Sequence, residues 1–185
     1  MAAGWNRIAR RIRVPLGFAF ALVYFWLAKP TLLFLALSLV LVLPGLLLRG
    51  YASGYVKKNA ELTITGPYAH TRNPLYLGSI LIAFGFALAA RSLWIAAALA
   101  ILFAAIYIPV IRSEEEYLRS AFPEFDAYAR KVPRLLPRLS VPKGTAEPEG
   151  AFSGTLYRKH RENNALLGAA GMYAALIVKL LPFRK

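Results

Sequence analysis

The sequence predicts an all-α fold: a polytopic membrane helical bundle with four to five transmembrane helices, an interfacial amino-terminal helix and a polar cap on the cytoplasmic side. The first observation is composition, since 58% of the 185 residues are hydrophobic and the mean hydropathy of +0.48 is high for a soluble domain. The second is pattern, because long uncharged runs alternate with short basic segments. A lipid bilayer is therefore the expected solvent for most of the chain.

The net charge and the counts of cysteine and histidine limit the kinds of ligand and partner that the protein can bind. The formal net charge of +14 is compatible with nucleic-acid binding, but Lys and Arg flank the apolar runs and form no separate polar domain. We therefore expect membrane lipids as partners and no nucleic acid. The chain has no cysteine and only two histidines, which excludes disulfides, thiolate catalysis and a histidine-rich metal centre. No metal site is predicted.

Residues 1–13 are predicted to form a basic interfacial helix. Trp5, Ile8 and Ile12 share one face of this helix, and arginines surround that face. A secretory signal peptide is the alternative, since a basic start precedes an apolar run. The run ends without a small-x-small cleavage site, so we expect the segment to remain in the mature protein.

Uncharged runs predict the membrane spans of a core that covers residues 14–138. A crossing takes roughly 20 residues, and the four runs are residues 14–28, 30–48, 75–90 and 92–111. The turn at Lys29 and Pro30 predicts an antiparallel hairpin for the first two. Pro109 is expected to kink the fourth helix near its end.

The distribution of basic residues predicts the orientation. The turns at Lys29 and Arg91 carry little charge, whereas the amino terminus and residues 49–72 and 112–138 are strongly basic. By the positive-inside tendency these three basic regions face the cytoplasm, and we expect the membrane to be a bacterial inner membrane. Residues 49–72 and 112–138 can then meet on one side.

Residues 61–78, ELTITGPYAHTRNPLYLG, are polar and bent although they lie between two apolar runs. Gly66 and Pro67 indicate a turn, and Pro74 favours the first turn of the next helix. Polar and aromatic side chains are thereby gathered at one helix mouth, namely Tyr68, His70, Arg72, Asn73 and Tyr76. The pattern predicts a site at the membrane surface.

Residues 112–138 are expected to carry the fourth helix out of the bilayer and then to fold back over its surface at two prolines. The stretch from Glu114 to Glu116 holds a third of the nine acidic residues. A solvated helix end with an ordinary ion pair between Glu115 and Arg119 explains this stretch in isolation. Its position opposite Arg72 favours a shared site instead.

A family resemblance is carried by GPYAHTRNPLYLG, followed by a helical hairpin and then by EE-x-x-L-x-x-x-F, a later tyrosine and V-P-R-x-x-P. In this order, over roughly residues 49–138, the motifs resemble those of the isoprenylcysteine carboxyl methyltransferase and phospholipid methyltransferase superfamily. The resemblance implies a membrane enzyme whose two motifs enclose S-adenosylmethionine on the cytoplasmic side, with an acceptor that arrives from the bilayer. The matching residues are Gly66, Pro67, Tyr68, Arg72, Pro74, Tyr76 and Gly78 in the first motif, and Glu114, Glu115, Leu118, Phe122, Tyr128 and Arg134 in the second. Asn73 departs from the family pattern, in which many members have histidine.

The chemistry of the cofactor agrees with these residue types. S-adenosylmethionine carries a carboxylate, an ammonium and a sulfonium, so its pocket benefits from a guanidinium, carboxylates and aromatic faces. With the resemblance, the candidate cofactor-binding residues are Gly66, Pro67, Tyr68, His70, Arg72, Asn73, Tyr76, Gly78, Glu114 and Glu115. An interfacial aromatic belt and a basic anchor explain the tyrosines and Arg72 equally well. No G-x-G-x-x-G follows a predicted strand, which argues against a soluble dinucleotide-type fold.

The sequence identifies no general base for a transfer reaction. Methyl transfer needs an aligned acceptor and exclusion of water, and only an amine or thiol acceptor needs proton removal. The candidate catalytic residues are Arg112, Arg134 and Glu115. We expect a lipidic or amphiphilic acceptor, either a prenylcysteine-type carboxylate or a phospholipid amine. A nicotinamide-dependent membrane reductase and a non-catalytic lipid-binding protein are the alternatives.

The remaining chain divides into residues 139–162, a linker with a basic segment, and residues 163–185, an apolar helix. Small residues such as Gly168 and Gly171 favour a fifth span packed against the bundle. Lys179 would then lie on the outer side, against the positive-inside tendency. A fifth span and a surface helix both remain open.

Overall fold

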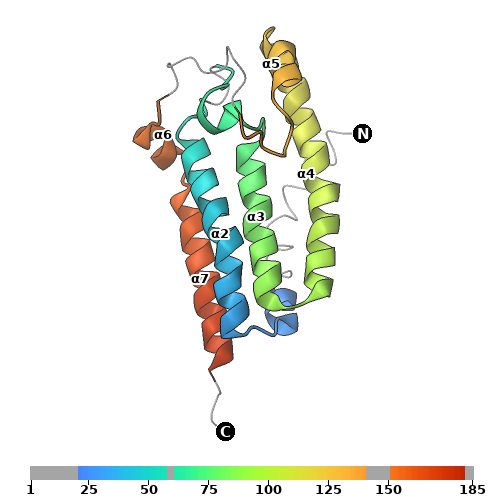
Figure 1. Cartoon of the computed structure of the whole chain (residues 1–185), viewed down its shortest axis with the longest axis vertical. Coiled ribbons are helices and arrows are strands. Elements are labelled where there is room, and N and C mark those ends of the chain that lie inside the picture. The colour runs from blue at the N-terminus through green and yellow to red at the C-terminus, as the bar shows by residue number, and fades with distance from the viewer. Residues whose placement is uncertain (1–20, 58–60, 141–150, 182–185) are drawn as a thin grey trace.

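The computed structural model describes residues 21–57, 61–140 and 151–181, and every regular element in these ranges is helical (Figure 1). The long helices are α2 (Leu32–Ser53), α3 (Pro74–Ala90), α4 (Leu93–Ala121) and α7 (Asn163–Leu180). The short ones are η1 (Gly66–Ala69), α5 (Phe125–Lys131) and α6 (Gly154–Lys159). The predicted all-α class is confirmed, while the interfacial helix predicted for residues 1–13 lies outside the described residues.

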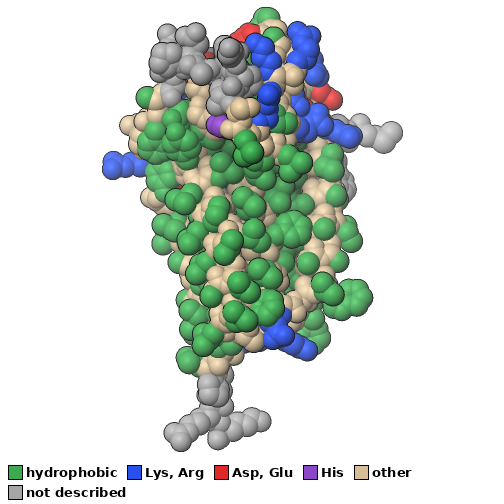
Figure 2. Space-filling view, in the orientation of Figure 1, with side chains coloured by type: hydrophobic (Ala, Val, Ile, Leu, Met, Phe, Trp, Pro, Cys, Tyr) green, Lys and Arg blue, Asp and Glu red, His purple; other side chains and the backbone are tan. Residues whose placement is uncertain are grey.

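The four long helices run side by side and form an apolar bundle (Figure 1). Among the described residues, α2, α4 and α7 are each long and apolar enough to cross a membrane, and α3 is a shorter apolar helix of 17 residues. Apolar side chains cover the middle of the bundle, whereas Lys and Arg gather mainly at the end that carries α5 (Figure 2). The predicted polytopic membrane bundle is therefore confirmed.

The carboxy-terminal helix α7 belongs to this bundle and lies beside α2 (Figure 1). Within the apolar contact, the Tyr173 hydroxyl donates to Ser38 Oγ at 2.7 Å, and Ser38 donates in turn to the Leu35 carbonyl. At the opposite end from α5, Lys179 Nζ donates to the backbone carbonyl of Trp26. Of the two alternatives that the sequence left open, the structure has the bundle helix and not the surface helix.

Helices α2 and α3 approach closely because glycines face each other. A Cβ atom on Gly45 would lie 2.8 Å from the Gly78 carbonyl oxygen, and one on Gly78 would lie 2.7 Å from the Gly45 carbonyl oxygen. Such contacts between small residues are typical of helix packing in membranes. A Cβ on Gly78 would also meet Arg49 Cγ at 2.6 Å, so the stem of Arg49 lies over bare backbone of α3.

Helix α4 is longer than a bilayer core. Its 29 residues extend about 43 Å at 1.5 Å per residue, compared with a hydrocarbon thickness of about 30 Å. The helix continues through Pro109 and becomes charged from Arg112 onward. Its last turns therefore carry Glu114 and Glu115 beyond the apolar band, as the sequence predicted.

The end of α4 carries a small cap with its own apolar cluster. Phe125, Tyr128 and Val132 are buried there and pack against partly buried residues that include Ile64 and Leu118. This cluster joins three segments that are distant in sequence: the approach to η1, the end of α4, and α5. The cap is thereby held over the mouth of the bundle.

Candidate functional site

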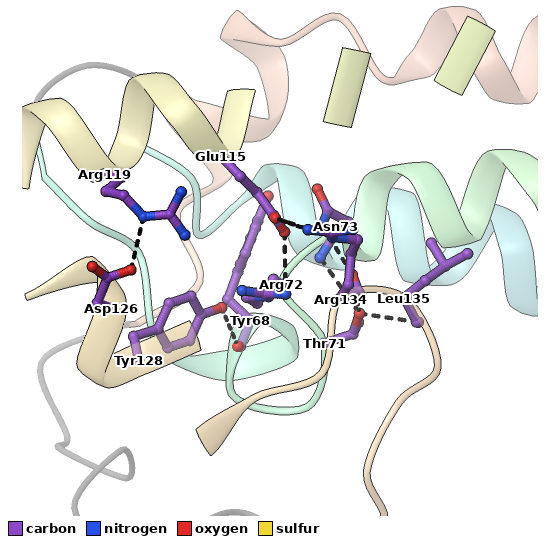
Figure 3. Close-up of polar contacts among 10 residues, drawn as sticks. All are labelled: Tyr68, Thr71, Arg72, Asn73, Glu115, Arg119, Asp126, Tyr128, Arg134 and Leu135. Carbon is purple, nitrogen blue, oxygen red and sulfur yellow. Dashed lines mark hydrogen bonds and ion pairs between the residues drawn. The ribbon is translucent and has the colours of Figure 1, made fainter. Parts of the chain in front are cut away.

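A strap formed by residues 132–138 lies along residues 70–73. The backbone amide of Arg72 donates to the Pro133 carbonyl at 2.9 Å, and that of Arg138 donates to the His70 carbonyl at 3.0 Å. Thr71 Oγ1 and Asn73 Nδ2 donate to backbone carbonyls of the strap, including that of Arg134 (Figure 3). The segment therefore folds back over the membrane end, as the prolines within it predicted.

Glu115 lies at the centre of a group that we call the Glu115 cluster, which also contains Arg72 and Arg134 (Figure 3). Its Oε2 accepts from Arg134 Nε at 3.0 Å and Arg134 Nη2 at 2.6 Å, and its Oε1 lies 3.4 Å from Arg72 Nη2. The hydrogen bonds from Arg134 to this carboxylate raise the pKa of Arg134. The two guanidiniums exceed the one carboxylate by one positive charge, so the cluster favours an anionic group.

Two buried atoms of this cluster have no hydrogen-bond partner among the described residues. They are Arg72 Nε and Glu115 Oε1, the latter being within ion-pair distance of Arg72 but not in hydrogen-bond geometry. Buried polar atoms are nearly always hydrogen-bonded, and each exception needs an explanation. A polar ligand bound beside Arg72 and Glu115 would supply the missing partners.

A pocket of about 430 Å³ lies at this position, between the cap and the bundle. Such a volume lies within the range of small-molecule sites. The Glu115 cluster contributes Arg72 and Glu115 to its wall, and α3 and α4 contribute Tyr76 and Tyr107. The rings of these two tyrosines meet edge to face with centroids 5.2 Å apart. Glu114 also lines the pocket, and its carboxylate has no ion-pair partner in the described parts of the chain.

Two buried tyrosines join the cap to the pocket. The Tyr128 hydroxyl donates to the Tyr68 carbonyl at 2.7 Å (Figure 3). Burial raises the pKa of Tyr68, and the nearby Tyr128, Glu114 and Glu162 raise it further. Burial likewise raises the pKa of Tyr128. Both phenols therefore stay protonated and carry no negative charge near neutral pH. The proton of Tyr128 is engaged by the Tyr68 carbonyl, and both rings line the pocket.

A second ion pair lies in the pocket wall, in a group that we call the Arg49 cluster: Arg49, Glu162 and Ser79. Glu162 accepts from Arg49 Nε at 3.0 Å and from Arg49 Nη2 at 2.8 Å. Arg49 Nη1 donates to Ser79 Oγ at 2.5 Å and to the Leu75 carbonyl at 3.3 Å. Helices α2 and α3 and the start of α7 thus meet at this wall.

The predicted site residues divide into two groups. Six of the candidate cofactor-binding residues line the pocket: Tyr68, Arg72, Asn73, Tyr76, Glu114 and Glu115. Four others lie outside its wall: Gly66, Pro67, His70 and Gly78. His70 bonds through Nδ1 to the Arg138 carbonyl of the strap, and Gly66 adopts a left-handed conformation with φ of 58° beneath the Tyr55 ring. Of the candidate catalytic residues, Glu115 lines the pocket. Arg134 lies outside the pocket wall and forms an ion pair with Glu115, and Arg112 is exposed outside the wall.

The sequence did not single out Arg49 or Glu162 as site residues. Arg49 resembles any basic flank of a membrane span, and Glu162 lies in a polar segment between a linker and an apolar helix. The signal that was available is that Glu162 is one of nine acidic residues and lies within an otherwise basic stretch. Nothing in the sequence connects it with Arg49, which is 113 residues away.

The fold and the pocket define an integral membrane protein that holds a ligand-sized cavity, lined by charged, aromatic and aliphatic side chains, at one end of a helical bundle. The sequence pattern of the family described as phospholipid methyltransferase matches residues 16–124. The chain belongs to this family, which confirms the superfamily that the two motifs indicated.

Two curated proteins are similar to part of the chain. The cobalt-zinc-cadmium resistance protein CzcN of Cupriavidus metallidurans is 46% identical over 94 residues, which are 51% of this chain and 43% of that protein. The nickel-cobalt-cadmium resistance protein NccN of Alcaligenes xylosoxydans xylosoxydans is 46% identical over 91 residues, 49% of this chain and 42% of that protein. The match therefore spans less than half of the length of either relative. No solved structure matches the chain.

Proposed function

We propose that this protein is an S-adenosylmethionine-dependent methyltransferase that acts on a lipidic or amphiphilic acceptor at the cytoplasmic membrane face. The observation that carries the proposal is a pair of buried atoms, Arg72 Nε and Glu115 Oε1, which find no hydrogen-bond partner in the described part of the chain and belong to residues lining a pocket of about 430 Å³. Membership of the phospholipid methyltransferase family supports methyl transfer as the reaction.

The residues of the pocket fit the charges of this cofactor. The Glu115 cluster has an excess positive charge and a guanidinium N–H without a partner among the described residues, which suit a carboxylate. The carboxylate of Glu114, which forms no ion pair within the described ranges, suits an ammonium. The faces of Tyr76 and Tyr107 suit a sulfonium, since aromatic rings attract cations. One pocket therefore offers a partner for each charged group of S-adenosylmethionine.

When bound, the cofactor supplies a methyl group that its sulfonium already activates. The protein then has to orient and enclose the reactants. Phe125, Tyr128 and Leu118 of the apolar cap cluster line the pocket and cover part of its polar side. Arg72 and Glu114 bind opposite charges and so define the direction in which a zwitterion lies. Leu75, Tyr76 and Ser79 of α3 form the wall nearest the bilayer, from which an amphiphilic acceptor is expected to arrive.

The names of the two similar proteins refer to resistance against metal ions and do not specify a methyl acceptor. In the described residues no group of three or more His, Cys, Asp or Glu side chains is arranged to hold a metal ion. We propose that the acceptor is a membrane amphiphile, because the wall nearest the apolar band is formed by α3 and α4 of the bundle.

Calorimetry on the purified protein in detergent tests the cofactor. We expect S-adenosylmethionine and S-adenosylhomocysteine to bind and the reduced nicotinamides NADH and NADPH not to bind. Binding of a nicotinamide in place of both adenosyl compounds would establish a reductase. Failure of all four to bind, with the fold intact by circular dichroism, would favour a non-catalytic lipid-binding protein.

A matched pair of arginine variants sharpens this test. Both Arg72 and Arg119 lie over the Phe125 ring, at 6.0 Å and 5.6 Å, but only Arg72 lines the pocket. Arg72→Met should weaken S-adenosylmethionine binding by one to two decades, since a hydrogen bond to a charged group contributes about 1.5–3 kcal/mol. Arg119→Met should leave it unchanged. Equal affinities in the two variants would contradict the assigned role of Arg72.

Single introduced cysteines test the proposed orientation, because the chain has none of its own. Ala127 is exposed on α5, and Lys29 is exposed in the turn at the opposite end of the bundle. With Ala127→Cys, a membrane-impermeant maleimide should label only after the cells are opened, whereas Lys29→Cys should react from outside. The reverse pattern would place the pocket on the outer face.

A further inference from the structure

Glu162 belongs to the carboxy-terminal part of the chain, beyond the residues 16–124 that match the family, and it reaches the pocket nonetheless. Its side chain is 10% exposed, and both carboxylate oxygens accept hydrogen bonds from Arg49. Such a bidentate pair between a planar guanidinium and a carboxylate fixes the orientation of both groups. The last helix of the bundle is thereby connected to the pocket wall.

The backbone around Glu162 is arranged for this contact. Glu162 is the N-cap residue of α7, a position where Ser, Thr, Asp and Asn commonly accept from the amides of the helix, and its longer side chain makes no such bond. The preceding Arg161 has φ of 53°, a left-handed conformation that is unfavourable for a residue with a side chain. His160 Nδ1 lies 2.9 Å from the Ser53 carbonyl and joins the junction to α2. The junction thus combines an unfavourable backbone conformation at Arg161 with a long-range ion pair between Glu162 and Arg49.

Arg49 links Glu162 to helix α3 through hydrogen bonds. Glu162 occupies Nε and Nη2, so Nη1 is directed at Ser79 Oγ and the Leu75 carbonyl. Ser79 Oγ in turn donates its proton to the Leu75 carbonyl at 3.0 Å. The proton of Ser79 is therefore committed, and the Leu75 carbonyl accepts from both Arg49 and Ser79. What remains at this wall are oxygen lone pairs on Ser79 and Glu162.

We infer that Glu162 is a positioning residue that, through Arg49, fixes a hydrogen-bond-accepting wall for the polar head of the methyl acceptor. This inference rests on the proposed methyltransferase function. With four of the five N–H groups of Arg49 engaged, the guanidinium does not offer a bidentate site to a carboxylate. The head group that the wall recognises is one that donates hydrogen bonds, such as an amine.

Binding of two chain-matched amphiphiles tests the inference. Dodecylamine and dodecanoic acid differ in the head group alone, and each is titrated calorimetrically into the protein saturated with S-adenosylhomocysteine in maltoside micelles. We expect the parent to bind the amine at least tenfold more tightly than the acid. Glu162→Gln should lose at least tenfold in amine affinity and keep its affinity for S-adenosylhomocysteine within threefold. Tighter binding of the acid by the parent would overturn the assignment.

Three further variants separate positioning from stability and from simple charge. The pair Arg49→Glu with Glu162→Arg keeps the ion pair and the net charge but removes the donors to Ser79 and Leu75. It should restore the melting temperature without restoring amine binding, and Arg49→Lys, a charge-conserving change, should also lose amine binding. Tyr157→Phe removes a hydrogen bond of the same segment outside the pocket, to Asn163, and should behave as the parent. Recovery of amine affinity in the swapped pair, or parental affinity in both Glu162→Gln and Arg49→Lys, would show a structural role only.

The proposed function and this inference fail in different ways. If the parent does not bind S-adenosylhomocysteine at all, the proposed function is wrong. If it binds that compound and the amine, but Glu162→Gln binds both equally well, the function stands and the positioning role is wrong.

Discussion

The Glu115 cluster and the Arg49 cluster use the same kinds of side chain at two walls of one pocket. They differ in how many of their polar atoms find hydrogen-bond partners within the protein. In the Arg49 cluster every carboxylate oxygen is hydrogen-bonded and the guanidinium donates in three directions. In the Glu115 cluster one carboxylate faces two guanidiniums, and a nitrogen and an oxygen remain without hydrogen bonds among the described residues. One cluster is saturated by the protein, and the other is not.

The difference lies in which hydrogen-bonding groups each cluster leaves for a ligand. The donors of Arg49 are engaged within the protein, so this pair holds three helices in place and leaves only acceptor oxygens at the pocket wall. An unsaturated buried ion pair is costly in the free protein and becomes satisfied when a polar ligand binds. Two similar clusters therefore predict different effects of substitution.

Glu115→Gln should have the largest effect, because Glu115 holds two ion pairs of the cap and, in the proposed function, lies beside the cofactor. Removing the charge leaves the buried guanidinium of Arg72 unpaired. Breaking a buried pair costs about 3–5 kcal/mol, and the lower end applies here because Arg134 is 48% exposed and can turn to water. We expect a melting temperature roughly 6–12 °C lower in detergent, together with weaker cofactor binding. The exposed neighbour supplies the control, since Glu116→Gln should change neither quantity.

Gly78→Ala should come next and should act on the Arg49 cluster without touching its charges. The added Cβ would meet Arg49 Cγ at 2.6 Å and the Gly45 carbonyl at 2.7 Å, and overpacking of this kind costs about 1–3 kcal/mol. Thermal unfolding measures the loss. Gly171→Ala on α7 meets no atom within 4 Å and should be neutral or slightly stabilising. Equal melting temperatures of the two variants would show that α2 and α3 do not need their close contact.

Glu114→Gln should separate the two properties that Glu115 combines. Glu114 is exposed, lines the pocket and has no ion pair within the described ranges, so the fold does not depend on its charge. We expect an unchanged melting temperature and about tenfold weaker binding of S-adenosylmethionine, equivalent to about 1.4 kcal/mol. Calorimetry and thermal unfolding on the same sample measure both. A drop in melting temperature with unchanged affinity would assign Glu114 to the framework instead.

Asp126→Asn should have the smallest effect of all. Its pair with Arg119, at 2.8 Å, has both side chains more than half exposed and lies outside the pocket. Exposed pairs contribute little and are screened by salt. Neither cofactor affinity nor melting temperature should change at physiological ionic strength. A shift as large as that of Glu115→Gln would mean that exposure does not distinguish the clusters.

Much of this architecture follows from the sequence because its signals are local. The uncharged runs predict the starts of α2, α3 and α4 within two residues, and Pro74 marks the start of α3 as observed. Helices α2 and α4 continue past the ends of their runs, to Ser53 and Ala121. The contact between the Arg72 and Glu115 segments follows from one inference, that both basic regions lie on the same membrane face. The strap follows from its prolines, although its hydrogen bonds to residues 70–73 do not.

The rest of the site depends on contacts between residues far apart in sequence, which local sequence patterns do not predict. Arg49 has the sequence context of a membrane anchor, and only the position of α7 shows that it faces Glu162. Gly78 belongs to a motif that resembles a cofactor site, yet in the structure it makes room for the stem of Arg49. A glycine in this motif can make room for a cofactor or for a neighbouring helix, and only tertiary packing shows which of the two applies.

The late position of Glu162 also sets the order in which the protein can be assembled. Arg49 is synthesised 113 residues before its partner, an interval on the order of ten seconds at typical translation rates. During that time α2 and α3 can insert and pair through their glycines, while the guanidinium has Ser79, water and lipid phosphates as partners. Arrival of α7 then supplies Glu162 as the carboxylate partner of Arg49. A ribosome stalled before residue 162 should hold an inserted bundle whose pocket wall is incomplete.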